Sequence, residues 1–374
     1  MKIVVALDSF KGSMTAERAC ALAAEEICLQ IPSAVVLQRP MADGGEGTAR
    51  AMMNALGGRW IERTVMGPLP DMEVEAGFAW FEEGKTALVE MAAASGLERL
   101  GSHQRNPLKT TTYGTGQLMK ASLEYQPDTI LLAVGGSATV DGGAGAAAAL
   151  GWGFLDKYAS PIPLGGVGLN DLATLLAPAD LNLPPVQVLC DVDNPLCGEH
   201  GAARVYGPQK GASPEMVDQL EDGLFRLGRV VSEQIGKDIL NLRGGGAAGG
   251  LAAGAVAFMN ATLVSGIDTI IAHYNLHKEL ADADWVITGE GCFDHQSLRG
   301  KVISGIVKAA DRTPAKVAVL AGQVRMSPQD YEKIGVSAAC ACKKDGMDIE
   351  YAISHSESLL RETARELVIQ KICP

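Results

Sequence analysis

The chain has 374 residues, of which 47% are hydrophobic and 20% are charged. Because a single hydrophobic core rarely grows beyond roughly 250 to 300 residues, this length predicts two domains. The formal net charge of −12 repels phosphodiester backbones and anionic lipid surfaces, so the composition argues against nucleic acids and membranes as partners. The sequence leaves the oligomeric state open, and an oligomer is compatible with it.

The cysteines and the N-terminal segment favour a cytoplasmic protein. The eight cysteines include no CxxC pair, and the chain is far too long for a disulfide-stapled scaffold. Cys340 and Cys342 alternate within an apolar stretch, which predicts that they are small core residues. Residues 1–8 resemble a buried strand rather than a signal peptide, and no apolar run approaches the roughly 18 to 20 residues that cross a membrane.

The first residues predict alternating strands and helices. We expect a strand at 2–7, a helix from 15 to 29 that stops before Pro32, a strand at 34–39 and a helix that ends at Gly57 and Gly58. This βαβα order is typical of a mostly parallel sheet.

The middle of the chain changes pattern. From 64 to 91 the apolar residues alternate around a turn at 82–85, which predicts an antiparallel hairpin. Strands are expected at 129–134 and 186–190. A long helix is expected to begin after Ser213, with Pro214 in its first position, and to end at Gly236.

The last third returns to the first pattern, with a strand at 284–288, a helix at 301–310 and a strand at 316–320. We therefore predict an α/β protein with two domains. Residues 1–65 and 265–374 would form a discontinuous Rossmann-like or flavodoxin-like domain with a parallel sheet, and residues 66–264 an inserted α/β domain. We expect the active site in the cleft between them.

Polar loops follow several predicted strands, where ligands of open α/β sheets bind. Carboxylates beside glycine-rich turns suit a magnesium-nucleotide site, because the acids hold the metal while backbone N–H groups hold phosphate oxygens. Each loop alone is also explained by helix capping. Four such loops, with Lys11, Lys210 and Lys301 nearby, favour phosphoryl transfer; they lie at 8–13, 43–47, 191–195 and 290–297.

Three further glycine-containing segments need an interpretation. Residues 79–86 match a loose Walker pattern, but two aromatic and two acidic residues inside it make a hairpin turn the better interpretation. Residues 244–249 read GGGAAG without a clear preceding strand, so a dinucleotide site is not favoured, although the run could present N–H groups to an anion. The segment 135–145 carries Ser137, Thr139 and Asp141, which close helix packing does not require, so we expect this loop to face a ligand.

Taken together, colinear motifs resemble the type I glycerate kinase family. They are DSFKGS at 8–13, ADGGEG at 42–47, MAAASG at 91–96, TTYGTG at 111–116, GGSAT at 135–139, GPQKGAS at 207–213 and TGEG at 288–291. The resemblance implies phosphorylation of D-glycerate by ATP with Mg²⁺ on a two-domain fold. It is nearer to the branch that yields 2-phosphoglycerate, but 3-phosphoglycerate stays open as the product. Remote alternatives are a hydroxy-acid dehydrogenase, which rests on the 244–249 run alone, and a small-anion sensor.

Loop position and residue type suggest roles for individual residues. Asp191 is the candidate base or orienter of the substrate hydroxyl, with Lys11 and Asp8 as further catalytic groups. The candidates for substrate binding are Ser13, Asp43, Arg204, Lys210 and Asp193. Asp294 and Asp193 are the candidate metal ligands. The candidates for nucleotide or phosphate binding are Gly135, Gly136, Ser137, Thr139, Gly246, Gly289, Glu290 and Lys301.

The sequence departs from the family pattern at two positions. Cys292 stands where the family commonly has Arg, and Val140 stands where it commonly has Asn. Loss of a guanidinium would weaken an anion contact or alter specificity. The region beyond about residue 326 matches poorly and is expected to be peripheral helix and strand.

Overall fold

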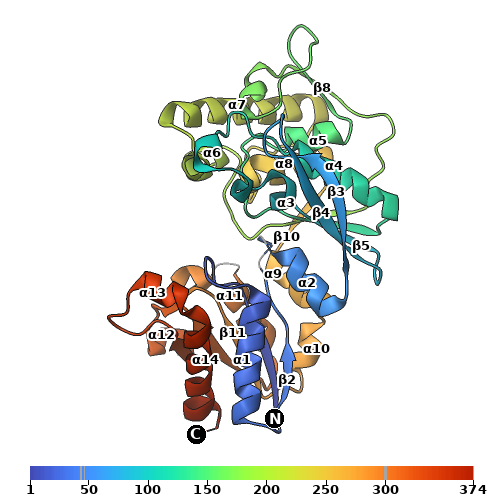
Figure 1. The fold of residues 1–374 in the computed structure, drawn as a ribbon. Coiled ribbons are helices and arrows are strands. Elements are labelled where there is room, and N and C mark those ends of the chain that lie inside the picture. The colour runs from blue at the N-terminus through green and yellow to red at the C-terminus, as the bar shows by residue number, and fades with distance from the viewer. Residues whose placement is uncertain (43, 46, 299–300, 374) are drawn as a thin grey trace. The chain divides into compact units, whose positions relative to one another are not determined.

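The computed structural model describes residues 1–42, 44–45, 47–298 and 301–373. The chain forms two compact units (Figure 1). The first comprises Met1–Asp43, Arg50–Gly57 and Ser265–Pro374, and the second comprises Gly44–Ala49 and Gly58–Val264. Each unit has its own largely parallel sheet with helices, which confirms the α/β class.

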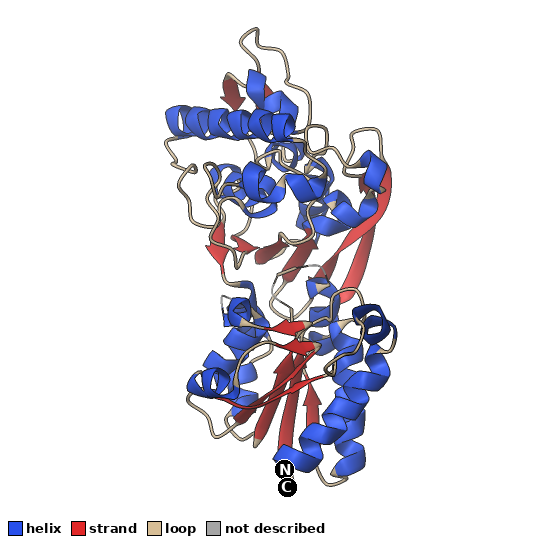
Figure 2. Cartoon of the chain, turned by 90° about the vertical axis from the view of Figure 1, so that its left-hand side faces the viewer, coloured by secondary structure: helices blue, strands red, loops and turns tan. Residues whose placement is uncertain are grey.

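The first unit is built on a parallel five-stranded sheet with the order β15-β13-β11-β1-β2. Its strands read as nearly continuous apolar runs because helices cover both of its faces (Figure 2). The prediction that the first and last segments of the chain share one sheet is confirmed. The strands are β1 (Lys2–Leu7), β2 (Val35–Gln38), β11 (Trp285–Gly289), β13 (Lys316–Ala321) and β15 (Val336–Ala341).

Several helices of this unit begin at a residue whose side chain caps the first turn. Thr15 accepts the N–H of Arg18 at the start of α1, as expected of an N-cap residue. The helices are α1 (Ala16–Gln30), α2 (Thr48–Leu56), α9 (Gly266–His273), α10 (Leu276–Leu280), α11 (Val302–Ala310), α12 (Pro328–Lys333), α13 (Ile349–Ser354) and α14 (Ser356–Leu367). A short parallel pair, β12 (Cys292–Phe293) with β14 (Gln323–Val324), extends the loops that follow β11 and β13.

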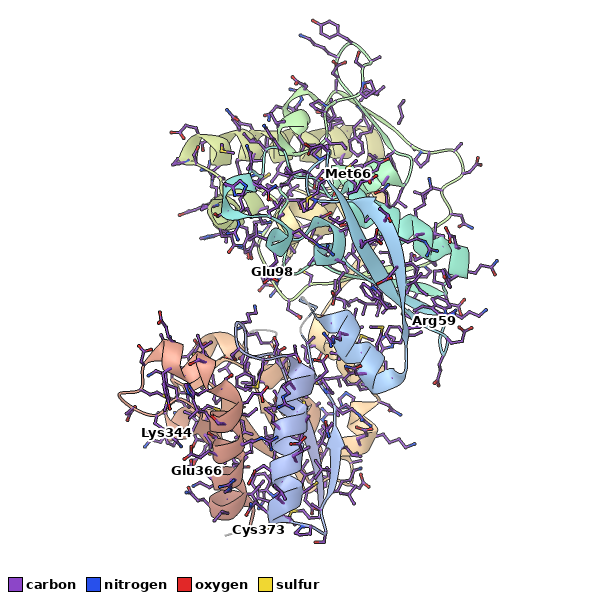
Figure 3. All side chains as sticks on the ribbon, in the orientation of Figure 1. Arg59, Met66, Glu98, Lys344, Glu366 and Cys373 are labelled. Carbon is purple, nitrogen blue, oxygen red and sulfur yellow. The ribbon has the colours of Figure 1, made fainter. Side chains whose placement is uncertain are left out.

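The prediction that the chain beyond 326 is peripheral is wrong. β15 forms an edge of the sheet, where it pairs with β13, and α14 packs beside α1 (Figure 1). Leu360 and Leu367 of α14 are fully buried in the same core as Leu22 and Ile27 of α1. At the surface, Lys344 pairs with Glu366 of α14 at 2.6 Å (Figure 3). The C-terminal segment therefore completes the core of the first unit.

The second unit is built on a six-stranded sheet with the order β10-β9-β6-β5-β4-β3. The strands β5 (Thr86–Glu90), β6 (Thr129–Ala133), β9 (Val186–Leu189) and β10 (Thr262–Val264) run parallel, whereas β3 (Arg59–Met66) and β4 (Glu73–Phe81) are antiparallel to their neighbours. The predicted boundary at 65 and 66 lies inside β3, whose ends Figure 3 labels. β3 belongs to the second unit because it pairs with β4 over its whole length.

Segment 79–86 is a hairpin, as predicted. It contains the end of β4, a turn at 82–85 and the start of β5, with Trp80 and Phe81 buried. The segment is therefore a strand and hairpin turn, without the helix that follows a Walker loop.

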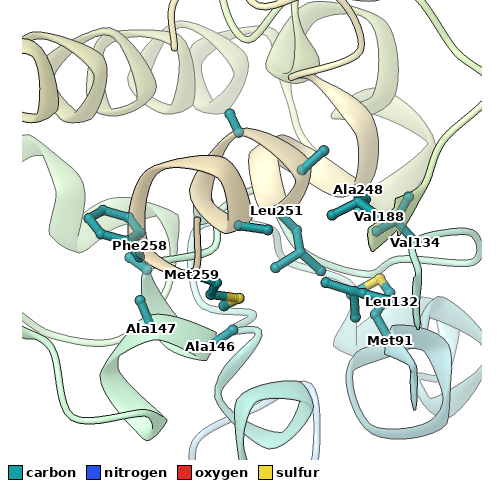
Figure 4. Close-up of a cluster of buried hydrophobic side chains, with 14 of the residues drawn as sticks. Met91, Leu132, Val134, Ala146, Ala147, Val188, Ala248, Leu251, Phe258 and Met259 are labelled. Atoms are coloured by element: carbon teal, nitrogen blue, oxygen red, sulfur yellow. The ribbon is translucent and has the colours of Figure 1, made fainter. Parts of the chain in front are cut away.

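The core of the second unit surrounds α8 (Leu251–Phe258). Leu251, Phe258 and Met259 pack with Leu132 of β6 and Val188 of β9 (Figure 4). Ser213 caps α7 (Pro214–Ile235), and Gly236, at φ +76°, ends it, both as predicted. The remaining helices are α3 (Met91–Ser95), α4 (Tyr113–Ser122), α5 (Ala144–Ala149) and α6 (Ala202–Tyr206), and β7 (Gly153–Leu155) pairs with β8 (Thr174–Leu176).

Within the described residues, every helix is either too short or too polar to cross a bilayer.

Candidate functional site

A pocket of about 410 Å³ lies in the first unit, at the carboxyl ends of its parallel strands. Loops that follow β1, β11, β13 and β15 line it, together with α13 and the start of α14. This is the edge where open α/β sheets bind ligands, because the loops and helix N-termini converge there.

The pocket gathers six of the residues that the sequence suggested for a functional site. Three carboxylates and three lysines line it, since Lys343 joins the predicted cations. Charges of both signs can serve a phosphate and its counter-ion. Glu290 is only 7% exposed, and its carboxylate pairs with the ammonium of Lys301 at 3.6 Å. The predicted residues in the pocket are Asp8, Lys11, Ser13, Glu290, Asp294 and Lys301.

The loop after β1 is a closed turn. The backbone N–H groups of Ser13 and Met14 donate to the carbonyl of Phe10, and the Ser13 hydroxyl donates to the same carbonyl at 3.0 Å. Gly12 adopts φ +77°, which glycine allows without strain. The side chain of Lys11 is exposed, and the hydrogen bonds within this turn hold its backbone in place.

Gly289 was predicted to bind phosphate, but the structure gives it a packing role. It is buried in β11, and a Cβ there would overlap the carbonyl oxygen of Leu320 in the neighbouring strand β13. The glycine allows the two strands to approach closely at the point where the pocket loops leave the sheet.

Cys292 and Asp294 lie on the loop after β11. The Cys292 thiol donates to the Asp294 carboxylate at 3.7 Å, and burial raises the pKa of Cys292, while Arg325 opposes this shift. Arg325 donates its backbone N–H to the carbonyl of Phe293. A guanidinium thus lies near residue 292, although from the neighbouring β14 segment rather than from position 292 itself.

One side of the pocket is apolar, and sequence reasoning missed it. Ile349 and Ile353 line this side, with side chains 47% and 42% exposed. The signal was present in the sequence, because the two isoleucines are four residues apart in a helix that Asp348 caps, so they share one face. The other members of this apolar wall are Phe10, Met14, Cys342, Ala352, Leu359 and Leu360.

In the second unit, Lys210 is tied to the loop that follows β6. Its ammonium group donates to the Ser137 hydroxyl and to the Thr139 carbonyl, both at 2.7 Å, and the residue is only 2% exposed. Burial lowers the pKa of Lys210 to about 7, and the nearby Asp141 carboxylate partly counteracts this. The predicted substrate cation is thus a buried group whose bonds hold the protein's own loop.

The rest of this loop is also held internally. Asp141 is fully buried and accepts hydrogen bonds from the backbone N–H and hydroxyl of Thr112, at 2.7 and 2.9 Å. Burial raises the pKa of Asp141, and these hydrogen bonds oppose the shift. Thr139 is fully buried, and its hydroxyl has no hydrogen-bond partner among the described residues. Asp141 therefore ties the loop to α4 instead of facing a ligand.

Gly135 and Gly136 begin the same loop. The Gly135 N–H donates to the carbonyl of Gly44 at 3.3 Å, and the Gly136 carbonyl accepts the N–H of Leu97 at 2.8 Å. Val140 is fully buried in the hydrophobic core, so the residue that departs from the family pattern is a packing residue here.

Two other predicted residues form exposed ion pairs. Both oxygens of Asp193 accept from the guanidinium of Arg243, at 2.7 and 2.8 Å. Arg204 donates to Asp218 of α7 at 3.2 Å. Asp191 is half-buried and lies two residues after the end of β9, the strand next to β6 in the sheet. Asp43 lies outside the described residues.

Gly246 does not offer its N–H to an anion. That group donates to the carbonyl of Asn194 at 2.9 Å, and a Cβ at this position would overlap the carbonyl of Pro195. Residues 236–246, all described, contain no strand, so the context of a dinucleotide fingerprint is missing. Close packing explains the glycines of this run.

The described residues contain no preformed group of three metal-ligating side chains. Mg²⁺ does not require one, because it commonly binds through one or two carboxylates, water and substrate phosphates. Asp8, Glu290 and Asp294 supply oxygen ligands of the right kind around the first-unit pocket. The donor set therefore fits a magnesium ion that arrives with a nucleotide.

The chain is similar to known proteins over almost its whole length. The model of the glycerate kinase family matches residues 3–371, including the C-terminal region that the motif comparison had left out. A glycerate kinase of Halalkalibacterium halodurans is 42% identical over 370 residues, which cover 98% of this chain and 97% of that protein. A glycerate 2-kinase of Escherichia coli is 39% identical over 368 residues, covering 98% and 93%. A crystal structure described as a glycerate kinase 2 of Salmonella typhimurium superimposes with a TM-score of 0.85 at 39% identity, covering 99% and 97%.

Proposed function

The chain belongs to the glycerate kinase family, and on that premise we propose that it transfers the γ-phosphoryl group of ATP to a hydroxyl of D-glycerate. The observation that carries this chemistry is the first-unit pocket, where carboxylates and lysines meet at the carboxyl edge of a parallel sheet. Phosphoryl transfer relies on positioning and on charge neutralisation, which such a set of groups supplies.

In the proposed reaction a glycerate oxygen attacks the γ-phosphorus, and the bond from that phosphorus to the β-phosphate bridging oxygen breaks. Asp191 accepts the hydroxyl proton, and ADP leaves with the electron pair of the broken bond. Lys11 and Lys301 hold phosphate oxygens, while Asp8, Glu290 and Asp294 are the acids available to Mg²⁺. A bound magnesium ion would neutralise charge on the phosphates.

We propose 2-phosphoglycerate as the product, supported by the name of the Escherichia coli relative, glycerate 2-kinase. We also propose that the protein works in the cytoplasm; the free thiols of all eight cysteines support a reducing compartment. The structure offers a dehydrogenase little support, because the 244–249 run lacks the strand that a dinucleotide site needs.

The test is phosphorus NMR of a mixture of the full chain, ATP, Mg²⁺ and D-glycerate. We expect a new resonance of 2-phosphoglycerate that grows with that of ADP. A resonance of 3-phosphoglycerate would overturn the assignment of the hydroxyl but not of the reaction. No phosphorylated glycerate, with or without Mg²⁺, would overturn the proposed function.

A further inference from the structure

We propose that the apolar wall of the first-unit pocket binds the adenine base of ATP, with Ile349 and Ile353 of α13 in contact with the base. The inference rests on the proposed function and deepens it, because it assigns the nucleotide to one pocket and gives the C-terminal segment a role in recognition. It also assigns Ser13, a substrate-binding candidate from the sequence, to the nucleotide together with Lys11.

The composition of the pocket selects a ligand with two different ends. Lys11, Lys301 and carboxylates line it, and so do aliphatic residues of α13 and the start of α14. Glycerate is small and polar throughout, so it would leave an aliphatic wall in contact with water. A nucleotide joins an anionic chain to a flat, largely apolar base, and therefore matches both sides.

The size and exposure of the pocket agree with this ligand. A volume of about 410 Å³ falls within the range of roughly 300 to 1,000 Å³ typical of sites for larger small molecules. Ile349 and Ile353 line the pocket while 47% and 42% of their surface remains accessible. Covering these branched side chains with a base removes apolar surface from water, which favours binding.

Two lysines of the pocket are available for the phosphate end of such a ligand. Lys301, the residue before α11, lines the pocket, and its ammonium group pairs with the Glu290 carboxylate there. Lys343 directly follows Cys342 of the wall, so charged and apolar groups adjoin along one short segment. A single nucleotide can therefore contact both sets.

The experiment measures ADP binding by calorimetry in the presence of Mg²⁺ and without glycerate, so that it does not depend on turnover. The test variant is the full chain with Ile349→Ser and Ile353→Ser together. The control is Ile369→Ser, an isoleucine of the same unit that is 52% exposed and does not line the pocket. Melting curves check that both variants fold.

We expect the double variant to bind ADP about five- to fiftyfold more weakly than the parent, and the control to bind it within about twofold. Inorganic pyrophosphate should bind the parent and the double variant equally, because it lacks a base. Unchanged ADP affinity in the folded double variant would overturn the proposal, as would pyrophosphate binding as tight as that of ADP.

A second measurement covers the case in which the double variant does not fold. Photolabelling of the parent with 8-azido-ADP should modify peptides from 8–14 or 342–360, and labelling confined to other segments would overturn the proposal. The two hypotheses fail separately. ADP binding that needs the isoleucines, without transfer to glycerate, would reject only the proposed function, whereas glycerate turnover with an unchanged KM for ATP in the double variant would reject only this inference.

Discussion

The ammonium group of Lys210 donates a 2.7 Å hydrogen bond to the hydroxyl of Ser137, a residue 73 positions earlier in the chain. A second 2.7 Å bond, to the carbonyl of Thr139, fixes the same loop from the inside. Lys210 is thus a positioning residue for the loop after β6, and its burial has a consequence for stability.

The free energy of unfolding should depend on pH through Lys210. The pKa is about 7 in the folded protein, against 10.5 as the ordinary value expected in the unfolded chain. Between these values the unfolded state binds more protons, so unfolding becomes less favourable as pH rises, and the destabilising effect is complete below pH 7. We predict that between pH 8 and 10 the unfolding free energy of the parent rises faster than that of Lys210→Met, by up to about 1.4 kcal/mol per pH unit.

Denaturant titrations at pH 8, 9 and 10 measure this difference. Groups common to both proteins cancel in the comparison, so equal pH slopes for the parent and Lys210→Met would contradict the lowered pKa. Steady-state kinetics of Lys210→Met provide a second measurement. Because this variant should displace the 135–139 loop, its kcat or KM should change even at saturating Mg²⁺.

Glu290 lies between two glycines, and substitution by alanine should lower the unfolding free energy strongly at Gly289 and little at Gly291. Gly289→Ala places a methyl group on the carbonyl oxygen of Leu320, so we expect a loss of about 3 kcal/mol or more, or an insoluble protein. At Gly291 an added methyl meets nothing within 4 Å, and Gly291→Ala should leave the unfolding free energy within about 1 kcal/mol of the parent. Thermal melts of both variants make the comparison, and equal melting temperatures would refute the packing role of Gly289.

The sequence predicted most elements because their signals are local. Thr15 and Ser213 are helix caps, and Gly236 ends α7, each recognisable within a few residues. The features that the sequence did not predict depend on contacts between residues far apart in the chain. The burial of Lys210 depends on Ser137 and Thr139, and the pairing of Asp193 with Arg243 spans 50 residues. Neither relation leaves a periodic pattern in the chain.

The C-terminal segment was misjudged for the same reason. The strand Val336–Ala341 is a short apolar run without a motif, and its place beside β13 depends on residues far away in the sequence. The predicted pocket residues, by contrast, came from a topological rule. Because ligands of open α/β sheets bind beyond the carboxyl ends of the strands, the loops with Asp8 and Glu290 were candidates, and both residues line the pocket.

Lys11→Met should weaken ATP binding and catalysis without affecting the fold. Lys11 is an exposed residue of the pocket, so its loss removes a positive charge beside the proposed phosphates but no core contact. We expect the KM for ATP to rise about tenfold and kcat to fall by a similar factor or more, because hydrogen bonds to charged groups contribute roughly 1.5 to 3 kcal/mol. The control is Lys371→Met, an exposed lysine of the same unit outside the pocket, and equal kinetics for the two variants would remove Lys11 from the site.

Asp191→Asn should lower kcat far more than it changes either KM. Asn keeps the size of the side chain but removes its charge and basicity, and a general base acts mainly in the transition state, so we expect a fall of about 10² to 10⁴-fold. A residue that only caps the turn after β9 would instead cost about 1 kcal/mol of stability and leave turnover nearly intact. Steady-state kinetics at two magnesium concentrations separate these roles; a kcat within about threefold of the parent would exclude Asp191 as the base.

The most direct test of the central claim is the release of ADP from ATP and Mg²⁺ with D-glycerate as acceptor, compared with glycerol at the same concentration. The two acceptors differ in the carboxylate, and a site built for that anion leaves its cations without a partner when glycerol binds. We predict glycerate-dependent ADP release at a rate at least about a hundredfold above that with glycerol. Equal rates with both acceptors, or no ADP release that depends on glycerate, would contradict the assignment of this chain as a glycerate kinase.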